Sequence, residues 1–310
     1  MSRLAWTNLL RLSFIWGAAF TFSGSAVKEV GFSTVVFLRV FIALAVVSGF
    51  LAYRRQLPHM SFSLLTTFLV MGLINNVVPF GFLFWAQSPL DGTETAKISS
   101  GLASIFNALT PFFAMLVARY IFFEERLSFK KATGVGLGFL GVTLLFIGTG
   151  AGDNQHGSAT WSYLAMAGCI IAAFSYGFGV VYGRRFARLG LTPTQGAFGQ
   201  LMGSSLLALP LMLTIDQPWS QPLPSTSFWA AMLGLAILST ALAYMIYFWL
   251  IENAGAVNAA LVTLLIPTSA MILGALFLNE SFGLWDFMGL GCILLGLLVI
   301  DGRLLSFRTS

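Results

Sequence analysis

The sequence predicts an all-α polytopic membrane protein with ten transmembrane helices, arranged as two inverted five-helix repeats. Three observations lead to this fold class. The chain of 310 residues is 57% hydrophobic and only 9% charged, whereas soluble domains carry about 25% charged residues. Ten apolar runs approach the length of about 20 residues that a membrane helix needs. Finally, the sequence around Pro111 is repeated around Pro267.

The ten apolar runs divide the chain into spans joined by short connections. We expect the first five helices at 9–27, 34–53, 64–86, 96–121 and 130–148. We expect the second five at 161–182, 195–214, 228–250, 256–278 and 284–301. The longest polar connections are the stretches 150–158 and 216–227. Almost nothing remains for a soluble domain, so any functional chemistry lies among the helices.

The repeat is clearest in the fourth and ninth runs and in the runs that follow them. Ala-Met follows the proline in both copies, as Ala114-Met115 and Ala270-Met271. After a one-residue offset, matching residues continue as Glu125, Gly134, Gly136 and Gly141 against Glu280, Gly289, Gly291 and Gly296. We expect one five-helix repeat at 1–150 and a second at 151–310. Because each contains an odd number of spans, the second enters the membrane from the opposite side, and the glycines predict close helix packing.

The basic residues indicate the orientation. With a cytoplasmic N-terminus, only Lys28 and Lys97 lie on the outer side, and the cytoplasmic ends hold Arg3, Arg11, Arg54, Arg55, Arg126, Lys130, Lys131, Arg184, Arg185, Arg188, Arg303 and Arg308. This asymmetry is the positive-inside pattern. We expect a protein of the cytoplasmic (inner) membrane with both termini cytoplasmic, and no nucleic-acid partner behind the net charge of +5. The N-terminal run resembles a signal peptide, but removing it would leave the sixth run without a mate.

Residues for metal, cofactor or enzymatic chemistry are sparse. Cys169 and Cys292 lie in apolar runs, and His59 and His156 have no Cys or carboxylate neighbours at ligand spacing. A GxGxxG pattern at 136–141 lies within an apolar helix and follows no strand. HExxH and GxSxG motifs are missing. We therefore expect no metal, no cofactor and no enzyme, with an intramembrane hydrolase or lipid transferase as the open alternative.

Three prolines within apolar runs mark candidate binding positions. A proline in a helix removes one hydrogen bond and displaces the carbonyl four residues earlier. The polar residues at those positions and their prolines are Asn75 and Pro79, Asn107 and Pro111, and Thr263 and Pro267. In lipid, an unsatisfied backbone group is tolerated only where protein, water or ligand covers it. Either these side chains repair their own helix breaks or they contact a ligand, and three instances favour a central cavity.

Further candidate substrate-binding side chains are polar or aromatic and share faces of the predicted helices. They are Trp16 and Phe20 in the first run, Asn76 in the third, Ser100 and Ser104 in the fourth, Ser175 and Tyr176 in the sixth, Gln200 in the seventh, and Thr240, Tyr244 and Tyr247 in the eighth. This set contains no cluster of Lys and Arg, which a phosphate-bearing ligand would favour. A small zwitterionic or amphipathic solute fits this set better.

Arg39 is a basic residue well inside an apolar run. A charge within the membrane is by default a functional hypothesis, and this one could receive a carboxylate group. Arg39 lies only five residues into the run at 34–53. Its side chain can therefore instead snorkel to the membrane surface or cap another helix end, and both interpretations stay open. No Asp or Glu lies near mid-membrane, which argues against a proton relay through deep carboxylates.

In these residues the chain resembles the EamA-type branch of the drug/metabolite transporter superfamily. The matching segments are Trp16-Gly17-Ala18-Ala19-Phe20, Phe37-Leu38-Arg39, Gly101 to Ser104 followed by Pro111 and Glu125-Arg126-Leu127, and Thr240 to Tyr244 followed by Pro267 and Glu280. Together they cover essentially the whole chain and are specific to the fold, but not to the solute. The resemblance implies a transporter with a ligand cavity between the two repeats, and similar family members include bacterial exporters of amino acids.

The leading hypothesis is a secondary transporter that exports small metabolites, above all amino acids, by alternating access. The alternatives are a carrier of hydrophobic drugs or nucleotide sugars, the intramembrane enzyme, and a passive structural or receptor protein. The expected partners are a small-molecule substrate and the lipid bilayer, with a monomer or a homodimer both open.

Overall fold

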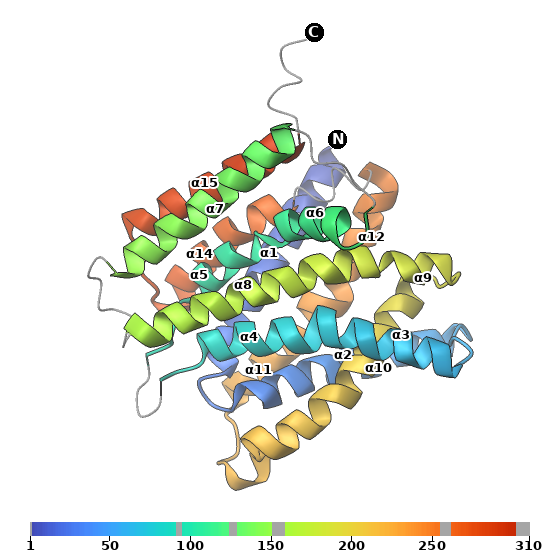
Figure 1. Ribbon diagram of the computed structural model, residues 1–310. Coiled ribbons are helices and arrows are strands. Elements are labelled where there is room, and N and C mark those ends of the chain that lie inside the picture. The colour runs from blue at the N-terminus through green and yellow to red at the C-terminus, as the bar shows by residue number, and fades with distance from the viewer. Residues whose placement is uncertain (1, 91–94, 124–128, 151–158, 255–261, 302–310) are drawn as a thin grey trace.

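The computed structural model describes residues 2–90, 95–123, 129–150, 159–254 and 262–301. Within these ranges the regular structure is helical, and the β pairing is confined to an isolated bridge between Pro89 and Ala96. The helices form one bundle, with several long helices running roughly side by side (Figure 1).

Helical segments occupy the five spans expected in the first half. Two of these spans are interrupted, the third by a π-helical segment and the fourth by a break. The segments are α1 (Arg3–Ala26), α2 (Phe32–Tyr53), α3 (Phe62–Gly72) continued by π-helical η1 (Leu73–Val77) and α4 (Val78–Gln87), α5 (Ser100–Asn107) followed by α6 (Thr110–Tyr120), and α7 (Phe129–Gly150).

The second half repeats this order. Its eighth span is interrupted by a π-helical segment, as the third is. The segments are α8 (Ala159–Tyr182) followed by α9 (Arg184–Arg188), α10 (Pro193–Leu211) with π-helical η3 (Met212–Asp216), the short η4 (Pro218–Ser220), α11 (Thr226–Leu233) continued by π-helical η5 (Gly234–Leu242) and α12 (Ala243–Ala254), α14 (Val262–Leu278), and α15 (Leu284–Asp301).

By length and composition, five described helical stretches are apolar enough to cross a membrane, and further apolar helices are shorter. The five are Phe32–Tyr53, Phe62–Gln87, Ser100–Tyr120, Thr160–Arg188 and Pro193–Ser220. The first span, α1, has 24 residues but is less hydrophobic, since it contains polar residues such as Ser13, Thr21 and Ser23. These three side chains are buried in the bundle. These small polar residues contact other helices rather than lipid.

The helix pairs that join the two halves follow the symmetry of the repeats. Each pair has a counterpart in which the corresponding spans of the two halves have changed places. The fifth and tenth spans, α7 and α15, lie against each other along their length (Figure 1). α1 of the first half packs on α14 of the second, and the equivalent pair is α8 of the second half on α6 of the first. The same relation links α10 on α3 with α2 on η5. The packing thus has the symmetry of two repeats, while the boundary expected at 150/151 adjoins residues outside the described ranges.

Glycines allow the close approach of α7 and α15. A Cβ atom on Gly134 would lie 2.6 Å from the carbonyl oxygen of Gly296, and one on Gly141 would lie 2.6 Å from that of Gly289. A side chain at these positions would force the helices apart. The repeated glycines therefore form a contact between the two halves of one chain, as small residues do between membrane helices.

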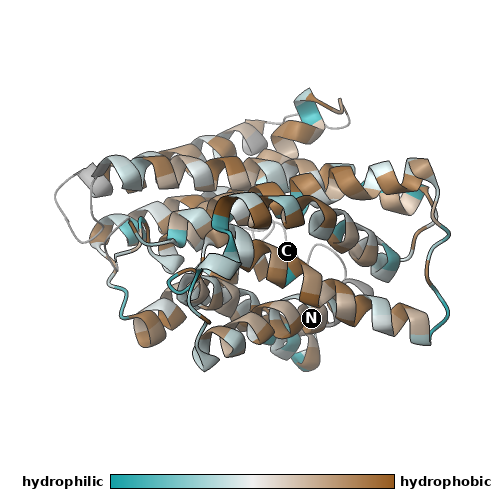
Figure 2. Ribbon diagram, turned by 90° about the horizontal axis from the view of Figure 1, so that it is seen from below, coloured by the Kyte–Doolittle hydropathy of each residue, from teal (hydrophilic) through white to brown (hydrophobic). Residues whose placement is uncertain are grey.

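The outer surface of the bundle is hydrophobic. Figure 2 shows hydrophobic residues along most helices, with hydrophilic residues prominent in several connections. Large apolar side chains are exposed on many different helices, for example Phe41, Leu140, Leu164, Leu206 and Ile272. Since apolar patches this extensive are rare on soluble monomers, the bundle is suited to contact lipid.

A carboxylate from the second half caps the start of the fourth span. Glu280 Oε1 accepts a hydrogen bond from the Ser100 backbone N–H at 2.6 Å, and Oε2 accepts one from the Gly101 N–H at 3.1 Å. The Ser100 hydroxyl also donates to Oε2, at 2.9 Å. The first N–H groups of a helix have no partner within it, and negative charge is favoured there. Glu280 therefore joins the two halves at one end of the bundle.

Two more carboxylates cap helices of the opposite half at the same end. Asp216 Oδ2 accepts from the Thr34 N–H at 2.6 Å, near the start of α2. Glu29 accepts from the Ser225 N–H at 2.8 Å and from its hydroxyl at 2.7 Å, at the start of α11. These hydrogen bonds stabilise the charged form of Glu29 and hold its pKa below the usual value.

Candidate functional site

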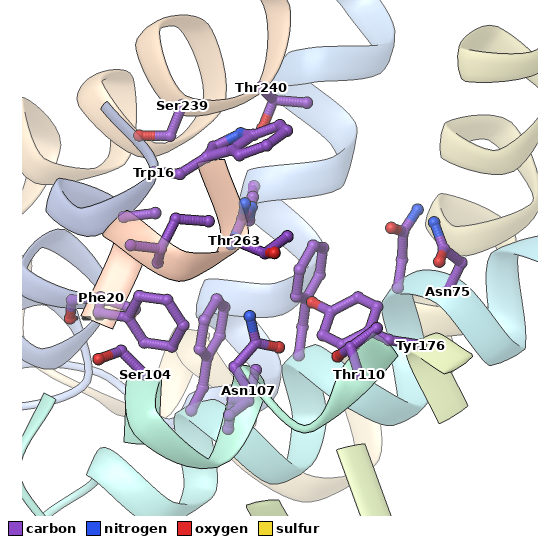
Figure 3. A pocket seen from close by; sticks show the side chains of 18 of the residues that line it. Trp16, Phe20, Asn75, Ser104, Asn107, Thr110, Tyr176, Ser239, Thr240 and Thr263 are labelled. Atoms are coloured by element: carbon purple, nitrogen blue, oxygen red, sulfur yellow. Dashed lines mark hydrogen bonds between the residues drawn. The ribbon is translucent and has the colours of Figure 1, made fainter. Parts of the chain in front are cut away.

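A cavity of about 260 Å³ lies between the two halves. Among the described residues, its walls come from the first four spans and from the sixth to ninth, whereas α7 and α15 contribute none. The volume is just below the ~300–1,000 Å³ typical of small-molecule sites. Figure 3 shows labelled side chains from several helices directed toward this space.

Many residues predicted from the sequence line this cavity. They come from both halves and are brought together by packing alone. They are Trp16, Phe20, Arg39, Asn75, Asn76, Ser104, Asn107, Tyr176, Thr240, Tyr244, Thr263 and Pro267.

Six other predicted residues lie outside its lining. They are Pro79, Ser100, Pro111, Ser175, Gln200 and Tyr247. Ser100 is held by Glu280 and lines a different cavity, of about 300 Å³, with Lys28 and Gln87. Helical spacing from Ser104 placed Ser100 on the right face, but one turn nearer the end of the bundle. Tyr247 lies behind Trp16, with ring centroids 5.3 Å apart.

Ser175 repairs a helix irregularity in another span. Its hydroxyl donates to the carbonyl oxygen of Ile74 at 2.5 Å. Ile74 lies in the π-helical segment η1, where hydrogen bonds run to the carbonyl five residues earlier, and the residue five positions after Ile74 is Pro79, which has no N–H. The sequence pointed instead to the carbonyl of Asn75, because it assumed an α-helix.

The structure adds lining residues that the sequence did not single out. Most are apolar or aromatic, and the polar ones are Ser23, Thr110 and Ser239. The others are Ala19, Val40, Phe80, Leu83, Phe84, Ala108, Val180, Leu201 and Ile266. Thr110 could have been found, since it lies beside Pro111 in the repeated motif.

π-Helical segments deliver polar residues to the cavity from both halves. Asn75 and Asn76 lie in η1 of the third span, and Ser239 and Thr240 lie in η5 of the eighth span. The Thr240 hydroxyl donates to the carbonyl oxygen of Leu235, five residues earlier, at 3.1 Å. π-Helical turns within α-helices are frequent at functional sites. The two segments that reach the cavity lie in spans that correspond to each other in the repeats.

A chain of hydrogen bonds fixes one wall of the cavity. Asn75 Nδ2 donates to Gln200 Oε1 at 3.0 Å, and Gln200 Nε2 donates to the Tyr244 hydroxyl at 3.2 Å. Nearby, Asn76 Nδ2 donates to the Ser204 hydroxyl at 2.7 Å. Gln200 is therefore a positioning residue, which orients Asn75 and Tyr244 toward the cavity.

Three polar atoms of the lining are buried without a hydrogen-bond partner in the described part of the chain. They are Arg39 Nε, Asn107 Oδ1 and Thr110 Oγ1. Buried polar groups are normally hydrogen-bonded, so each exception needs an explanation. Figure 3 shows Asn107 and Thr110 on the helices that meet at the break in the fourth span.

Arg39 lines the cavity and lies against two aromatic rings. Its guanidinium carbon lies 3.9 Å from the centre of the Phe80 ring and 5.8 Å from that of Phe84. A cation over an aromatic face is attracted to the ring electrons. The side chain is thus held inside the bundle, at the cavity.

Comparison with known proteins assigns the chain to a family. The model of the EamA-like transporter family matches residues 6–147 and again residues 163–301. An S-adenosylmethionine/S-adenosylhomocysteine transporter of Chlamydia trachomatis is 24% identical over 298 residues, which cover 91% of this chain and 86% of the relative. A WAT1-related chloroplastic protein of Arabidopsis thaliana is 25% identical over 305 residues, 96% of this chain and 69% of the relative.

Another relative is YedA of Escherichia coli, an uncharacterized inner membrane transporter. It is 26% identical over 207 residues, 67% of this chain and 63% of the relative. A solved crystal structure superposes with a TM-score of 0.62 over 100% of both chains at 19% identity, so the fold is shared. The expected all-α fold of ten membrane helices in two repeats is confirmed. This chain belongs to the EamA-like transporter family.

Proposed function

We propose that this protein exports small metabolites, amino acids foremost, by alternating access through the cavity between its two halves. The observation that carries the proposal is the cavity itself. Described residues of eight spans line it, and among them are buried polar atoms without a partner in the described part of the chain. A solute that supplies those partners would be bound there, away from both membrane surfaces.

The chemistry of the lining supports an amino acid as the solute. The cavity combines apolar and aromatic walls with amide and hydroxyl groups and one guanidinium. Its volume of about 260 Å³ suits a small molecule. Phosphorylated solutes such as nucleotide sugars would favour a cluster of Arg and Lys, and the described lining contains a single arginine.

The packing symmetry supports alternating access. When two inverted repeats exchange conformations, the cavity opens first to one side and then to the other. Glu29, Asp216 and Glu280 join the halves at one end of the bundle. These three contacts would have to separate when the cavity opens at that end, and re-form when it closes.

The membrane placement follows from the distribution of basic residues. We infer an inner-membrane protein with both termini in the cytoplasm, with repeats divided near residues 150 and 151. The end closed by the three carboxylates then faces outward. A monomer contains the complete cavity, and a homodimer is compatible with the apolar outer surface.

The test is uptake of a panel of radiolabelled amino acids into proteoliposomes. The wild-type protein is compared with Asn107→Ala, with empty vesicles, and with Asn253→Ala as a matched control, because Asn253 is exposed on α12. We expect uptake that Asn253→Ala retains and Asn107→Ala lowers by about tenfold or more. Transport of other metabolites but of no amino acid would refute the amino acid assignment.

A second candidate cargo follows from one relative. The Chlamydia trachomatis protein is named as an S-adenosylmethionine/S-adenosylhomocysteine transporter, and both of those solutes contain an amino acid group. Including S-adenosylmethionine in the panel separates the candidates. Inhibition of amino acid uptake by excess S-adenosylmethionine would indicate a shared site with room for the larger solute.

A further inference from the structure

Arg39 is a cation without a counter-ion in the described part of the chain. It lies in α2, at the cavity, and its Nε is buried without a hydrogen-bond partner. The charged group faces the Phe80 and Phe84 rings and the hydroxyl-bearing residues Tyr176 and Tyr244. None of these side chains carries a negative charge at neutral pH, so the described residues supply no compensating charge to the arginine.

The cation–π contact with Phe80 does not replace a counter-ion. Removing a guanidinium from water carries a large desolvation penalty, and an aromatic face returns only part of it. The contact does hold the guanidinium over the Phe80 ring, with its carbon 3.9 Å from the ring centre. Arg39 is therefore held at the cavity with hydrogen bonds to donate, and its Nε has no acceptor among the described residues.

Complementary groups lie elsewhere in the same lining. Asn107 Oδ1 and Thr110 Oγ1 can accept hydrogen bonds, and both are buried without partners. They come from the fourth span, whereas Arg39 comes from the second. As far as the chain is described, the cavity thus holds a cationic donor without an acceptor on one helix and neutral acceptors without donors on another.

We propose that Arg39 binds the carboxylate of the transported solute, while Asn107 and Thr110 accept hydrogen bonds from its ammonium group. Guanidinium and carboxylate form two parallel, charge-assisted hydrogen bonds, which makes the contact strong and directional. Trp16 and Phe20 would then contact an apolar side chain of the solute. This inference rests on the proposed transport function and narrows its substrate class to small amino carboxylates.

The experiment uses two probes that differ only in the carboxylate, L-phenylalanine and L-phenylalaninamide. Binding to the purified full-length protein is measured by calorimetry, and transport of both probes is measured in proteoliposomes. We expect the wild type to bind phenylalanine about 10–100-fold more tightly than the amide, as a hydrogen-bonded charge pair implies. Arg39→Gln should lose this preference, whereas Arg39→Lys should keep part of it because the charge remains.

Arg54→Gln is the matched control. Arg54 ends the same helix but is exposed, so this variant should retain the wild-type preference. A third probe, 3-phenylpropanoate, lacks the amine. Its binding should weaken in Arg39→Gln and stay unchanged in Asn107→Ala, which assigns the two ends of the solute to the two residues.

Two results would overturn the inference. The first is wild-type protein that binds the amide as tightly as the acid, or neither of them. The second is Arg39→Gln protein that folds and keeps the acid preference. Equal transport of acid and amide would refute the proposed contact between Arg39 and the carboxylate, but not the proposed transport function. If the wild-type protein transports no solute, the proposed transport function is itself refuted. If Arg39→Gln does not fold, Arg39→Lys and the wild-type probe pair still decide.

Discussion

The fourth and ninth spans carry the same proline motif but differ in structure. In the fourth, the helix stops at Asn107 and a new helix begins at Thr110. In the ninth, α14 runs unbroken from Val262 to Leu278, with Pro267 inside it. Equivalent sequences in the two repeats therefore give a broken helix in one half and a continuous helix in the other.

The break changes what each span offers to the cavity. Pro111 lies in the first turn of α6, where a backbone N–H has no partner to lose. The break also leaves Asn107 and Thr110 with unpartnered polar atoms at the cavity. Thr263, by contrast, has an interaction within the chain. The two repeats therefore share a plan but present different polar atoms to the cavity.

The largest expected effect is a difference between Asn107 and Thr263, the equivalent residue of the second repeat. Asn107→Ala should lower the initial rate of amino acid uptake by about tenfold or more, because it removes a hydrogen bond to a charged group of the solute. Thr263→Ala should have a much smaller effect. Uptake is compared at equal amounts of reconstituted protein. Equal losses in both variants would show that the two spans contribute equally after all.

The prolines should differ in their effect on stability. Pro267→Ala restores an N–H to a continuous helix and should stabilise the protein by about 1–3 kcal/mol. Pro111→Ala should bring no such gain, since the N–H it adds lies in the first turn of a helix. Melting temperatures of the purified variants in detergent measure the difference. A gain of equal size for both would contradict the structural distinction between the two spans.

The start of the fourth span depends on the other half. Glu280→Gln removes the charge that receives three hydrogen bonds at α5, and should destabilise the protein by about 0.5–2 kcal/mol. Asp286→Asn is the matched control, because Asp286 accepts from Gly283 at the start of its own helix. The control should leave the association of the two halves unchanged. A normal melting temperature for Glu280→Gln would exclude Glu280 as a link between them.

The smallest effect concerns the start of the eighth span. The Ser225 N–H and hydroxyl lower the pKa of Glu29. A lowered folded-state pKa stabilises the protein above the unfolded value, and this contribution is lost as the pH falls through the folded value. Glu29→Gln should therefore melt below wild type at pH 7, and the difference should shrink as the pH falls below about 4.3 and Glu29 becomes protonated. A difference that stays the same as the pH falls would point to a steric origin.

The positions of the helices were predictable, but several side-chain environments were not. Hydrophobic runs depend on composition alone, so the ten spans appear in the expected order. Ser100 was assigned to the cavity because the sequence gives no sign that Glu280, 180 residues away, lies against it. Phe80 was overlooked because an aromatic residue in a membrane helix usually faces lipid. Only packing shows that it lies beneath Arg39.

The π-helical segments could not be predicted from the sequence either. No simple residue pattern predicts where an α-helix widens, and η1 and η5 move polar residues such as Asn76 and Ser239 relative to an ideal helix. Proline spacing found the right regions of the third and fourth spans. It pointed to the carbonyl of Asn75, four residues before Pro79, whereas Ser175 donates to the carbonyl of Ile74, five residues before it.

The most direct test of the account is trans-stimulation. Proteoliposomes are loaded with an excess of an unlabelled amino acid that the panel shows to be transported, and the initial uptake of the same amino acid in labelled form is measured. Alternating access through one cavity predicts faster uptake into loaded vesicles than into empty ones, and loss of this acceleration in Asn107→Ala. Equal uptake into loaded and empty vesicles would contradict a carrier that alternates between two sides.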